Sequence, residues 1–457
     1  MHGALVKVLA TLGPSTMDPG VVAEMARLGV SGFRINLSHG DRGVWDRMLR
    51  SIHGAEEAAG RRLAIIADLE GPRVRLGSFK PIHVGRGDTI RLSIDGDGVP
   101  VDRPEFFDAV EPGDEVLIAD GRVVLRITGK GGGWAEGEVL AGSVIEPRKG
   151  VVIRGKDLPL PPLTEKDLRD LEYVASRDFS HVMVSYANDP GHVEAVREEL
   201  RSRGAGHIRV IAKIETPRGV LNAGRIAGRS DGVVVARGDL GMHYPLEEIP
   251  WIQARIIREA RDRYKPVILA TELLPSMIDS PVPVRSDVVD VYTGARSGVD
   301  ALLLTSETAV GRYPVEAVRW LTRIIESALR DYEPYRPPAA GPEYRLARGI
   351  VELVENLDGV LVLYSRSGTF PGRISAFRPG NGYYVGVPTV AVARSIAILW
   401  GSNPHIVPAQ DYQEGLDKTV KLLEGELDGT VVMAAWSREQ DYYHVRIRLH
   451  RGPQGPS

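Results

Sequence analysis

The sequence of 457 residues contains no cysteine, which excludes both a disulfide framework and a metal site with thiolate ligands. It also lacks any uninterrupted apolar run of about 18 residues, the length that a membrane-spanning helix requires. Its first residues do not have the long apolar stretch of a signal peptide. We therefore expect no membrane partner, and these absences fit a cytoplasmic protein.

The sequence has little excess charge of either sign. Its 57 Lys and Arg residues nearly balance its 60 Asp and Glu residues, which leaves a net charge of −3. This balance argues against a nucleic-acid partner bound through a basic patch. Asn and Gln are also scarce, as in many thermophilic proteins, but the basic residues are mostly arginine, which genome composition would explain as well. A thermophilic source is therefore left open.

Eight short runs rich in Val, Ile and Leu are typical of strands buried on both faces. They are Leu5–Thr11, Gly32–Leu37, Leu63–Leu69, His181–Tyr186, Ile208–Glu215, Gly232–Ala236, Pro266–Thr271 and Ala301–Thr305. Amphipathic helical patterns follow them, over Pro19–Leu28, Val44–Ala59, Glu165–Ser176, Gly191–Arg203, Pro217–Ala227, Pro250–Tyr264, Arg285–Arg296 and Val315–Leu329. Eight alternating pairs predict an α/β protein built on a closed (β/α)8 TIM barrel.

The barrel pattern is interrupted once and ends before the chain does. Residues 77–152, here called the inserted unit, carry many Gly and Asp turn signals between short alternating stretches, which predict a small β-barrel domain. Residues 331–457, the C-terminal unit, follow a proline-rich linker and predict a further α/β domain. Its expected strands are Gly359–Tyr364, Pro388–Ala391, His405–Pro408, Thr430–Ala434 and Tyr443–Leu449. The barrel itself would comprise residues 1–76 and 153–330.

Polar side chains gather at the carboxyl ends of the predicted barrel strands, where active sites of such barrels lie. They are Arg34, Asn36, Ser38, Asp68, Ser185, Lys213, Glu215, Arg237, Asp239, Thr271, Thr305, Ser306 and Glu307. The opposite strand ends are not enriched in this way. If the loops were simply polar, both ends would look alike, so the asymmetry indicates an active site.

Lys213 and Glu215 lie on one face of the same strand, because side chains alternate along a strand. By themselves they would also fit a structural ion pair. Asp239 adds a second carboxylate at the end of the next strand. Two carboxylates from neighbouring strands, with a lysine beside them, suit Mg²⁺ or Mn²⁺ next to a phosphate or an enolate.

Seven stretches of the sequence resemble those of the pyruvate kinase family and occur in the family's order. They are Ala10–Ser15, Arg34–Gly40, Asp68–Arg75, Ala212–Glu215, Ala236–Gly241, Ala270–Met277 and Thr305–Pro314. Each alone is a weak signal, but seven in order over most of the chain are specific. The resemblance implies transfer of a phosphoryl group from phosphoenolpyruvate to ADP, which yields pyruvate and ATP.

The resemblance also implies a role for individual residues. Lys213 would stabilise charge on the transferring phosphoryl group, and Glu215 and Asp239 would hold the divalent cation. The backbone of Gly238 and Asp239 and the Thr271 hydroxyl would hold the substrate carboxylate, with Thr271 in the protonation relay.

Phosphate contacts would come from three arginines, Arg34, Arg75 and Arg154. His39 would either touch the nucleotide or serve a structural purpose. The inserted unit would act as a lid that excludes water, and the chain would assemble as a homotetramer.

A monovalent-cation site made of Asn36, Ser38, Asp68 and the carbonyl of Leu69 also follows from the resemblance. Here, however, Arg73 occupies a position at which relatives with this site usually have Glu. Arg73 would place a fixed positive charge near the K⁺ position, so we expect activity without K⁺. The alternative is that Arg73 points to solvent and K⁺ still binds.

A hydroxyl-rich loop in the C-terminal unit suits a phosphate group, although a plain connecting loop would look similar. It comprises Ser365, Arg366, Ser367, Gly368 and Thr369, with Arg373 shortly after. In the family the equivalent loop binds a phosphorylated sugar, so we expect a sugar-phosphate effector here.

Two other functions remain as alternatives. One is a carbon–carbon lyase that stabilises an enolate on Mg²⁺, and the other is a non-catalytic metabolite-binding regulator. The inserted unit and Lys213 argue against the lyase. The presence of Arg34, Lys213, Glu215, Asp239 and Thr271 argues against a regulator that has lost its catalytic residues.

Overall fold

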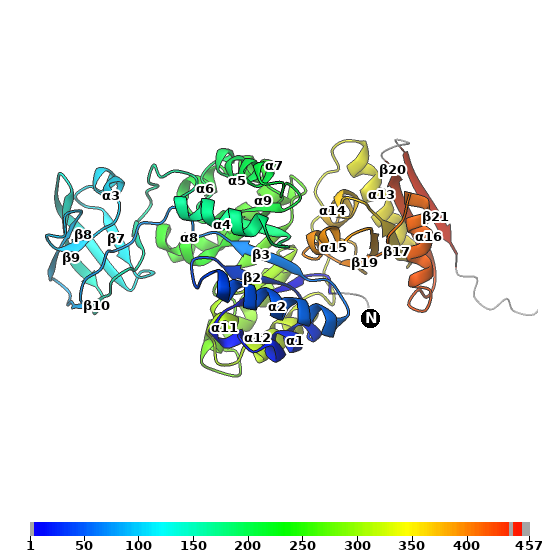
Figure 1. The fold of residues 1–457 in the computed structure, drawn as a ribbon, viewed down its shortest axis with the longest axis horizontal. Helices are drawn as coiled ribbons and strands as arrows, with labels where there is room; N and C mark the ends of the chain where they lie inside the picture. Colours follow the sequence, from blue (N-terminus) through cyan, green and yellow to red (C-terminus); the bar gives the residue numbers. More distant parts are fainter. Residues whose placement is uncertain (1–3, 438–441, 450–457) are drawn as a thin grey trace, which may run out of the picture.

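The computed structural model describes residues 4–437 and 442–449. Three units follow one another along its long axis, with the inserted unit at one end, the barrel in the middle and the C-terminal unit at the other end (Figure 1). The predicted (β/α)8 barrel is confirmed, because eight parallel strands close in the order β1-β16-β15-β14-β13-β12-β3-β2. Among the described residues, no helix has the length and apolar composition needed to cross a membrane.

The barrel strands correspond to the eight predicted apolar runs. They are β1 (Lys7–Leu12), β2 (Val30–Asn36), β3 (Ala64–Asp68), β12 (His181–Val184), β13 (Arg209–Ile214), β14 (Gly232–Ala236), β15 (Val267–Ala270) and β16 (Ala301–Leu304). Nearly all of their residues are buried, because helices cover the outside and side chains fill the interior. Because both faces are buried, the strands appear in the sequence as continuous apolar runs.

The helices that surround the barrel begin at side-chain caps in several cases. The larger ones are α1 (Pro19–Arg27), α2 (Arg42–Ala59), α4 (Glu165–Ala175), α5 (Pro190–Ser202), α9 (Ile249–Arg261), α10 (Arg285–Arg296) and α12 (Pro314–Ala328). Asp18, Asp41 and Thr164 each accept a hydrogen bond from a backbone N–H of the first turn, which stabilises that helix end.

The single helix predicted over Pro217–Ala227 is wrong, because the chain forms two helices there. They are α6 (Pro217–Leu221) and α7 (Ala223–Arg229). Asn222 ends the first helix with φ −95° and ψ 7°, and its side-chain amide donates to the Asn188 carbonyl at 2.9 Å. This tertiary contact is not visible in a helical periodicity.

The inserted unit forms two sheets around one core. Its elements are β4 (Ile82–His83), β5 (Thr89–Ser93), β6 (Val99–Pro100), α3 (Pro104–Ala109), β7 (Glu115–Ile118), β8 (Val123–Gly131), β9 (Trp134–Ala141), β10 (Val144–Ile145) and β11 (Val151–Ile153). The larger sheet has the order β11-β7-β8-β9-β5-β6, and β10 pairs with β4. Val74, Leu76 and Ile153 pack in the same core, just outside the predicted limits of 77 and 152, so those limits stay a prediction.

The C-terminal unit is a five-stranded sheet with helices. Its elements are α13 (Pro342–Asn356), β17 (Val360–Tyr364), α14 (Thr369–Ala376), β18 (Tyr383–Val387), α15 (Val390–Ile396), β19 (Ser402–Ile406), α16 (Tyr412–Leu422), β20 (Val431–Ser437) and β21 (Tyr442–Arg448). The predicted strand Pro388–Ala391 is wrong. The strand ends at Val387, and the Thr389 hydroxyl then caps α15 by accepting from the Val392 N–H.

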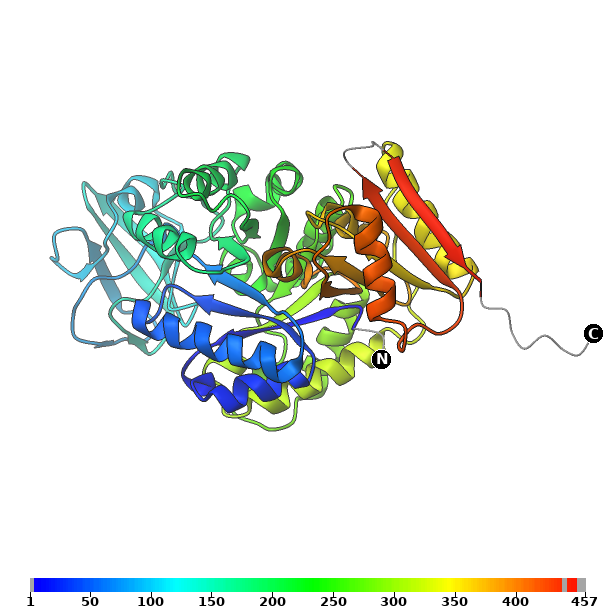
Figure 2. The same cartoon turned by 45° about the vertical axis from the view of Figure 1, so that its right-hand side comes forward.

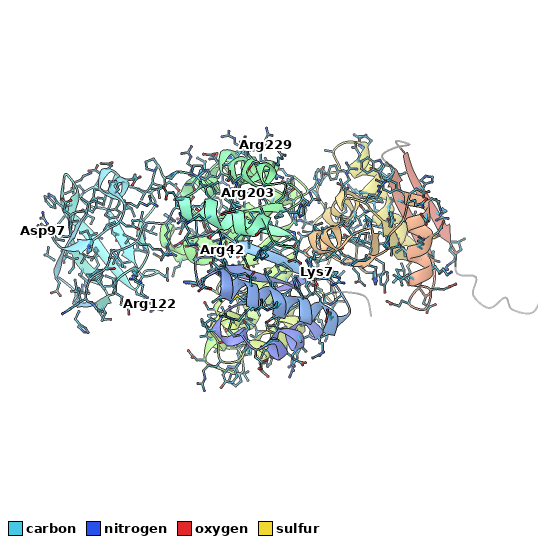
Figure 3. The ribbon with its side chains drawn as sticks, viewed as in Figure 1. Lys7, Arg42, Asp97, Arg122, Arg203 and Arg229 are labelled. Atoms are coloured by element: carbon cyan, nitrogen blue, oxygen red, sulfur yellow. The ribbon has the colours of Figure 1, made fainter. Side chains whose placement is uncertain are left out.

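The C-terminal unit closes the end of the barrel at which the strands begin (Figure 2). Ala397 and Ile398 belong to the same buried cluster as Leu9 and Met183 in the barrel interior. Lys7, the first residue of β1, donates to the Ser402 carbonyl at 2.7 Å and is labelled at this junction in Figure 3. The carboxyl ends of the strands, where the polar residues gather, therefore face the inserted unit.

A buried ion pair joins the two units at this junction. Arg378 donates to both carboxylate oxygens of Asp300, at 3.0 and 2.6 Å, and to the Gly298 carbonyl at 2.7 Å. Asp300 also accepts from the backbone N–H groups of Val267 and Trp400. Both charged side chains are almost fully buried, at 2% and 1% exposed.

Replacing Arg378 with Met should destabilise the protein strongly, because Asp300 would keep a buried charge without its cationic partner. Breaking such a pair typically costs about 3–5 kcal/mol. Thermal and urea unfolding would measure the loss, with Arg42→Met on the exposed face of α2 as the control. The double variant Arg378→Met, Asp300→Asn should recover part of the loss, and an unchanged unfolding temperature in Arg378→Met would contradict the assignment.

Candidate active site

A cavity of about 950 Å³ opens at the carboxyl ends of the barrel strands. The barrel contributes Arg34, His39 and Thr271 to its lining, and the turn after β7 in the inserted unit contributes Asp120. Some of the polar strand ends singled out in the sequence line this cavity, namely Arg34, Asn36, Thr271, Thr305 and Ser306, whereas Lys213, Glu215 and Asp239 are not among its lining residues. Such a cavity, lined by two units, can change shape when the inserted unit moves.

Lys213 lies among three polar side chains at the ends of neighbouring strands. Its Nζ lies 3.2 Å from Glu215 Oε2 and 3.7 Å from Asp68 Oδ1, and it donates to Ser185 Oγ at 3.0 Å. The lysine side chain is 16% exposed and the two carboxylates are 3% or less. A cation is thus held in a nearly dry environment by carboxylates from β3 and from the end of β13.

Arg34 approaches the same cluster from β2. Its Nε donates to Asp68 Oδ2 at 2.8 Å, its Nη2 contacts the same oxygen, and its Nη1 donates to the Thr11 hydroxyl at 3.1 Å. Asp68 therefore lies between two cations, Arg34 and Lys213. Of these two cations, Arg34 lines the cavity.

Burial and charge together determine the protonation of the cluster. Burial lowers the pKa of Lys213, but the carboxylates of Asp68, Glu215 and Asp239 outweigh it, so the pKa is raised and the lysine stays charged. Burial also raises the pKa of Glu215 to about 7, with Asp239 adding to the rise and Lys213 opposing it. A further cation beside Glu215 would favour its charged form.

The carboxylate oxygens of the cluster are suited to a divalent cation. Glu215 Oε1 accepts from the Tyr186 N–H at 2.6 Å, while Glu215 Oε2 and Asp68 Oδ1 are buried and have the Lys213 ammonium beside them, at 3.2 and 3.7 Å, but no geometrically formed hydrogen bond. Within residues 4–437 and 442–449, no cluster of three or more His, Asp or Glu could bind a metal by itself. A cation here would take its remaining ligands from substrate and water, which suits Mg²⁺.

Asp239 and Gly238 lie in the first turn of α8 (Arg237–His243), directly after β14. The Gly238 N–H donates to the Thr271 hydroxyl at 2.8 Å, which ties this turn to the end of β15. Thr271 and Glu272 both have positive φ, 69° and 54°, a strained conformation for residues other than glycine. Arg237 supports it by donating to both of their carbonyls, at 2.8 and 3.0 Å.

Two of the predicted phosphate ligands do not reach the cluster. Arg75 donates to Glu70 Oε1 from its Nε at 3.1 Å and from its Nη2 at 2.6 Å, and it lines a neighbouring cavity. Arg154 is exposed and donates to Glu115 at 2.7 Å on β7, within the inserted unit. His39 does line the main cavity, and its carbonyl accepts from the Trp45 indole at 2.8 Å.

The predicted monovalent-cation ligands have protein partners. Asn36 Oδ1 accepts from the Ser38 N–H at 3.1 Å, and the Leu69 carbonyl accepts from Ser185 Oγ at 2.7 Å. Arg73 lines the cavity of about 950 Å³, and its Nη2 donates to Asp120 Oδ1 of the inserted unit at 3.0 Å. Arg73 therefore bridges the barrel and the inserted unit.

The predicted effector loop lies far along the chain, between β17 and α14. Ser365 Oγ accepts from the Gly368 N–H at 3.1 Å, and the hydroxyls of Ser367 and Thr369 are 3.0 Å apart. Arg366 stacks over the Tyr412 ring at 5.7 Å. Arg373 donates to the Tyr443 hydroxyl at 2.8 Å, so it packs against aromatic side chains beside the loop.

Two residues of the site were missed in the sequence. Tyr186 presents its backbone N–H to Glu215 from a positive φ of 55°, and Asp120 reaches the cavity from the inserted unit. The Asp-Gly pair at Asp120 was a visible turn signal, but nothing local indicated that this turn meets the barrel.

This fold and site define a class, the (β/α)8-barrel enzymes with a lysine and carboxylates clustered at the carboxyl ends of the strands. The family model described as pyruvate kinase, barrel domain, matches residues 4–318. Pyruvate kinase of Aeropyrum pernix is 48% identical over 450 residues, covering 97% of this chain and 98% of the relative. Pyruvate kinase of Pyrobaculum aerophilum is 40% identical, covering 97% of each chain.

Solved structures agree with these matches. The crystal structure of pyruvate kinase from Pyrobaculum aerophilum covers 98% of this chain and 100% of its own, with a TM-score of 0.91 and 38% identity. That of a pyruvate kinase from Cryptosporidium parvum has a TM-score of 0.90 and 25% identity and covers 97% of this chain and 96% of its own. The chain belongs to the pyruvate kinase family and is a phosphotransferase of glycolysis.

Proposed function

We propose that this chain transfers the phosphoryl group of phosphoenolpyruvate to ADP in the cavity at the carboxyl ends of the barrel strands. The observation that carries the proposal is the buried cluster of Lys213, Glu215 and Asp68, with Arg34 beside it. In the transfer, the bond between phosphorus and the enol oxygen breaks, and a bond to the terminal phosphate oxygen of ADP forms. The products are ATP and the enolate of pyruvate, which a proton then converts to pyruvate.

Lys213 and Arg34 supply the positive charge that this step requires. Phosphoryl transfer depends mainly on positioning and on neutralising the charge of the phosphoryl oxygens. Lys213 is kept protonated by its carboxylate neighbours, and low exposure strengthens its field. Arg34 is oriented by Asp68 and by the Thr11 hydroxyl, so its guanidinium is held before substrate arrives.

Glu215 and Asp239 would hold the divalent cation, Mg²⁺ or Mn²⁺. When bound, the cation neutralises negative charge on the phosphoryl oxygens and on the enolate. Glu215 Oε2, which has only the ion pair with Lys213 at 3.2 Å and no hydrogen bond, supports this assignment, and the Tyr186 N–H binds the other oxygen of the same carboxylate. Asp239 follows a different strand, β14, and its charge acts on Glu215, which supports a shared cation between the two carboxylates.

Thr271 and the first turn of α8 would hold the carboxylate of the substrate. The bond from the Gly238 N–H to Thr271 Oγ keeps the turn and the hydroxyl together. Thr271 would then belong to the relay that passes a proton to the enolate. The inserted unit would close over this site through Asp120 and exclude water that competes with ADP.

Replacing Lys213 with Met should lower kcat by about 1,000-fold or more, because the transferring group loses a preorganised positive charge. An assay of pyruvate formation with Mg²⁺ and ADP measures this. Lys149→Met, the same substitution in the inserted unit, is the control. Glu215 would lose its neighbouring cation, so folding is checked by circular dichroism. Turnover close to that of the parent chain would reject the role of Lys213.

Activity without K⁺ forms part of the proposal. Arg73 supplies a permanent positive charge in the cavity that also contains Arg34 and Asn36. The carbonyl of Leu69 and the amide of Asn36 already have protein partners. The fixed charge of Arg73 in this cavity would take the place of a monovalent ion.

The rate of pyruvate formation in tetramethylammonium buffer should therefore change less than twofold when K⁺ is added. Arg73→Met should lower the rate in tetramethylammonium buffer, because the fixed cation is removed. An exposed arginine of the inserted unit, replaced in Arg122→Met, serves as the control. A large increase in the rate of the parent chain on addition of K⁺ would contradict this part of the proposal.

A sugar-phosphate effector would bind the loop from Ser365 to Thr369. Its hydroxyls and backbone N–H groups lie directly before α14 and suit a phosphate. Arg209, the first residue of β13, donates to the Ser367 carbonyl at 2.9 Å, which connects this loop to the strand that carries Lys213. Assembly into a homotetramer, supported by family membership, also belongs to the proposal.

Replacing Ser365, Ser367 and Thr369 together with Ala should abolish activation by sugar phosphates, because the loop loses its three hydroxyl ligands. The kcat and KM without effector should stay within about twofold, since the loop lies at the other end of the barrel. Kinetics with fructose 1,6-bisphosphate, glucose 6-phosphate and ribose 5-phosphate test this. Activation of the triple variant equal to that of the parent chain would reject the site.

A further inference from the structure

Arg237 binds two consecutive residues that have an unfavourable backbone conformation. Thr271 and Glu272 follow β15 with φ of 69° and 54°, a region that is costly for residues with a side chain, above all a branched one. The Arg237 guanidinium donates to the Thr271 carbonyl from Nε at 3.3 Å and from Nη2 at 2.8 Å, and Nη2 also donates to the Glu272 carbonyl at 3.0 Å. Such a conformation persists only where surrounding contacts enforce it, and these bonds are contacts of that kind.

The Arg237 guanidinium is itself held by a second helix. Its Nη1 donates to Asp290 Oδ1 at 2.7 Å, and Asp290 lies on α10. The arginine side chain is only 9% exposed, whereas that of the aspartate is 39% exposed. All three nitrogens of the guanidinium therefore have a partner, and this planar group cannot turn without losing hydrogen bonds.

The hydroxyl of Thr271 is bound by the turn that also carries Asp239. The Gly238 N–H, in the first turn of α8, donates to Thr271 Oγ at 2.8 Å. Ala236, which precedes this helix, offers no side-chain cap, so the threonine supplies an acceptor that the start of the helix needs. Because Arg237 and Gly238 are neighbours in the chain, one short turn binds both the carbonyl and the hydroxyl of Thr271.

The proton of the Thr271 hydroxyl remains for a ligand. Within residues 4–437 and 442–449, this hydroxyl accepts from the Gly238 N–H but donates to no acceptor of the protein. Thr271 lines the cavity of about 950 Å³, so a bound molecule can accept from it. The direction of this O–H depends on the backbone conformation of Thr271, which Arg237 stabilises.

Arg197 on α5 shows what a purely structural arginine looks like in the same barrel. It donates to the Arg229 carbonyl and to Asp231 Oδ2, both at 3.0 Å, and its side chain is 19% exposed. Figure 3 labels Arg229 at the outer edge of the barrel, and neither partner has a positive φ or lines the cavity. Arg237 differs because its backbone partners are the positive-φ pair at the cavity.

We propose that Arg237 is a positioning residue of the active centre, which keeps the Thr271 hydroxyl directed at the substrate by holding the backbone of Thr271 and Glu272. Asp290 acts one step further out, because it holds Arg237. The inference rests on the proposed function, in which Thr271 binds the substrate carboxylate and belongs to the proton relay. Arg237 itself contacts neither the substrate nor the reacting atoms.

Arg237→Met and Arg237→Lys separate the geometry of the guanidinium from its charge. Lysine keeps the positive charge but cannot bind two carbonyls and a carboxylate in one plane. Both variants should raise the KM for phosphoenolpyruvate about 10-fold or more, because the hydroxyl is misplaced, while the KM for ADP stays within about threefold. Arg197→Met, the matched control, should leave both constants within about twofold.

Two kinetic results would overturn the inference. Parent-like constants in Arg237→Lys would show that charge alone matters at this position. An equal rise of both KM values in the Arg237 variants would show a general disturbance of the site instead of a loss at Thr271.

Exchange of the methyl hydrogens of pyruvate with D₂O reports on the protonation step in reverse. A C–H bond of the methyl group breaks to give the enolate, and a deuteron from solvent is then added to the carbon. The exchange is followed by NMR with Mg²⁺ and inorganic phosphate, so that no phosphoryl group is transferred. Both Arg237 variants should exchange about 10-fold more slowly or less, since the relay loses its orientation. A rate equal to that of the parent chain would contradict the proposal.

Asp290→Ala is a second test, which leaves Arg237 in place. It should show the same pattern to a smaller extent, with changes of about threefold in the KM for phosphoenolpyruvate and in the exchange rate. If circular dichroism shows that the Arg237 variants do not fold, this variant decides alone, and parent-like values in it would reject the role of Arg237. A parent chain that forms no pyruvate would reject the proposed function itself, a result that is distinct from any outcome with the variants.

Discussion

Charge balance around Lys213 is the constraint on which the active centre depends. Asp68 and Glu215 surround a lysine with little access to water, and Arg34 binds Asp68 from the other side. Removing one member would leave a buried charge without its counter-charge, which is costly in a medium of low polarity. The cluster is therefore held as a unit, and its positive charges are oriented before an anionic substrate arrives.

The two ends of the barrel have different roles: the amino ends of the strands contribute to stability, and the carboxyl ends carry the polar residues of the site. At the amino ends, Ala397 and Ile398 fill the barrel interior and Arg378 pairs with Asp300, so this end is closed and rigid. At the carboxyl ends, a cavity of about 950 Å³ remains, and Asp120 of the inserted unit lines it together with barrel residues. Because one end is sealed, motion of the inserted unit can change the site without disturbing the barrel.

Much of this arrangement could be predicted from local patterns. Strands buried on both faces show as apolar runs, so β13 and β14 were located within about two residues, and Lys213, Glu215 and Asp239 followed as their polar ends. The prediction of a strand over Pro388–Ala391 was wrong, because Thr389 caps helix α15 there. Arg154, to which the family resemblance gives a phosphate contact, pairs with Glu115 of β7, and this contact depends on the sheet of the inserted unit.

By itself, the sequence determined the barrel, the position of the insertion and the identity of the charged strand ends, because those depend on periodicity and on side-chain alternation. Only the tertiary structure decided which of these charges meet. It brought Asp68 between Arg34 and Lys213, placed the Tyr186 N–H on Glu215, and turned Arg73 toward Asp120. Such contacts join residues far apart in the chain, and no local pattern records the distance between two strand ends until the barrel has closed.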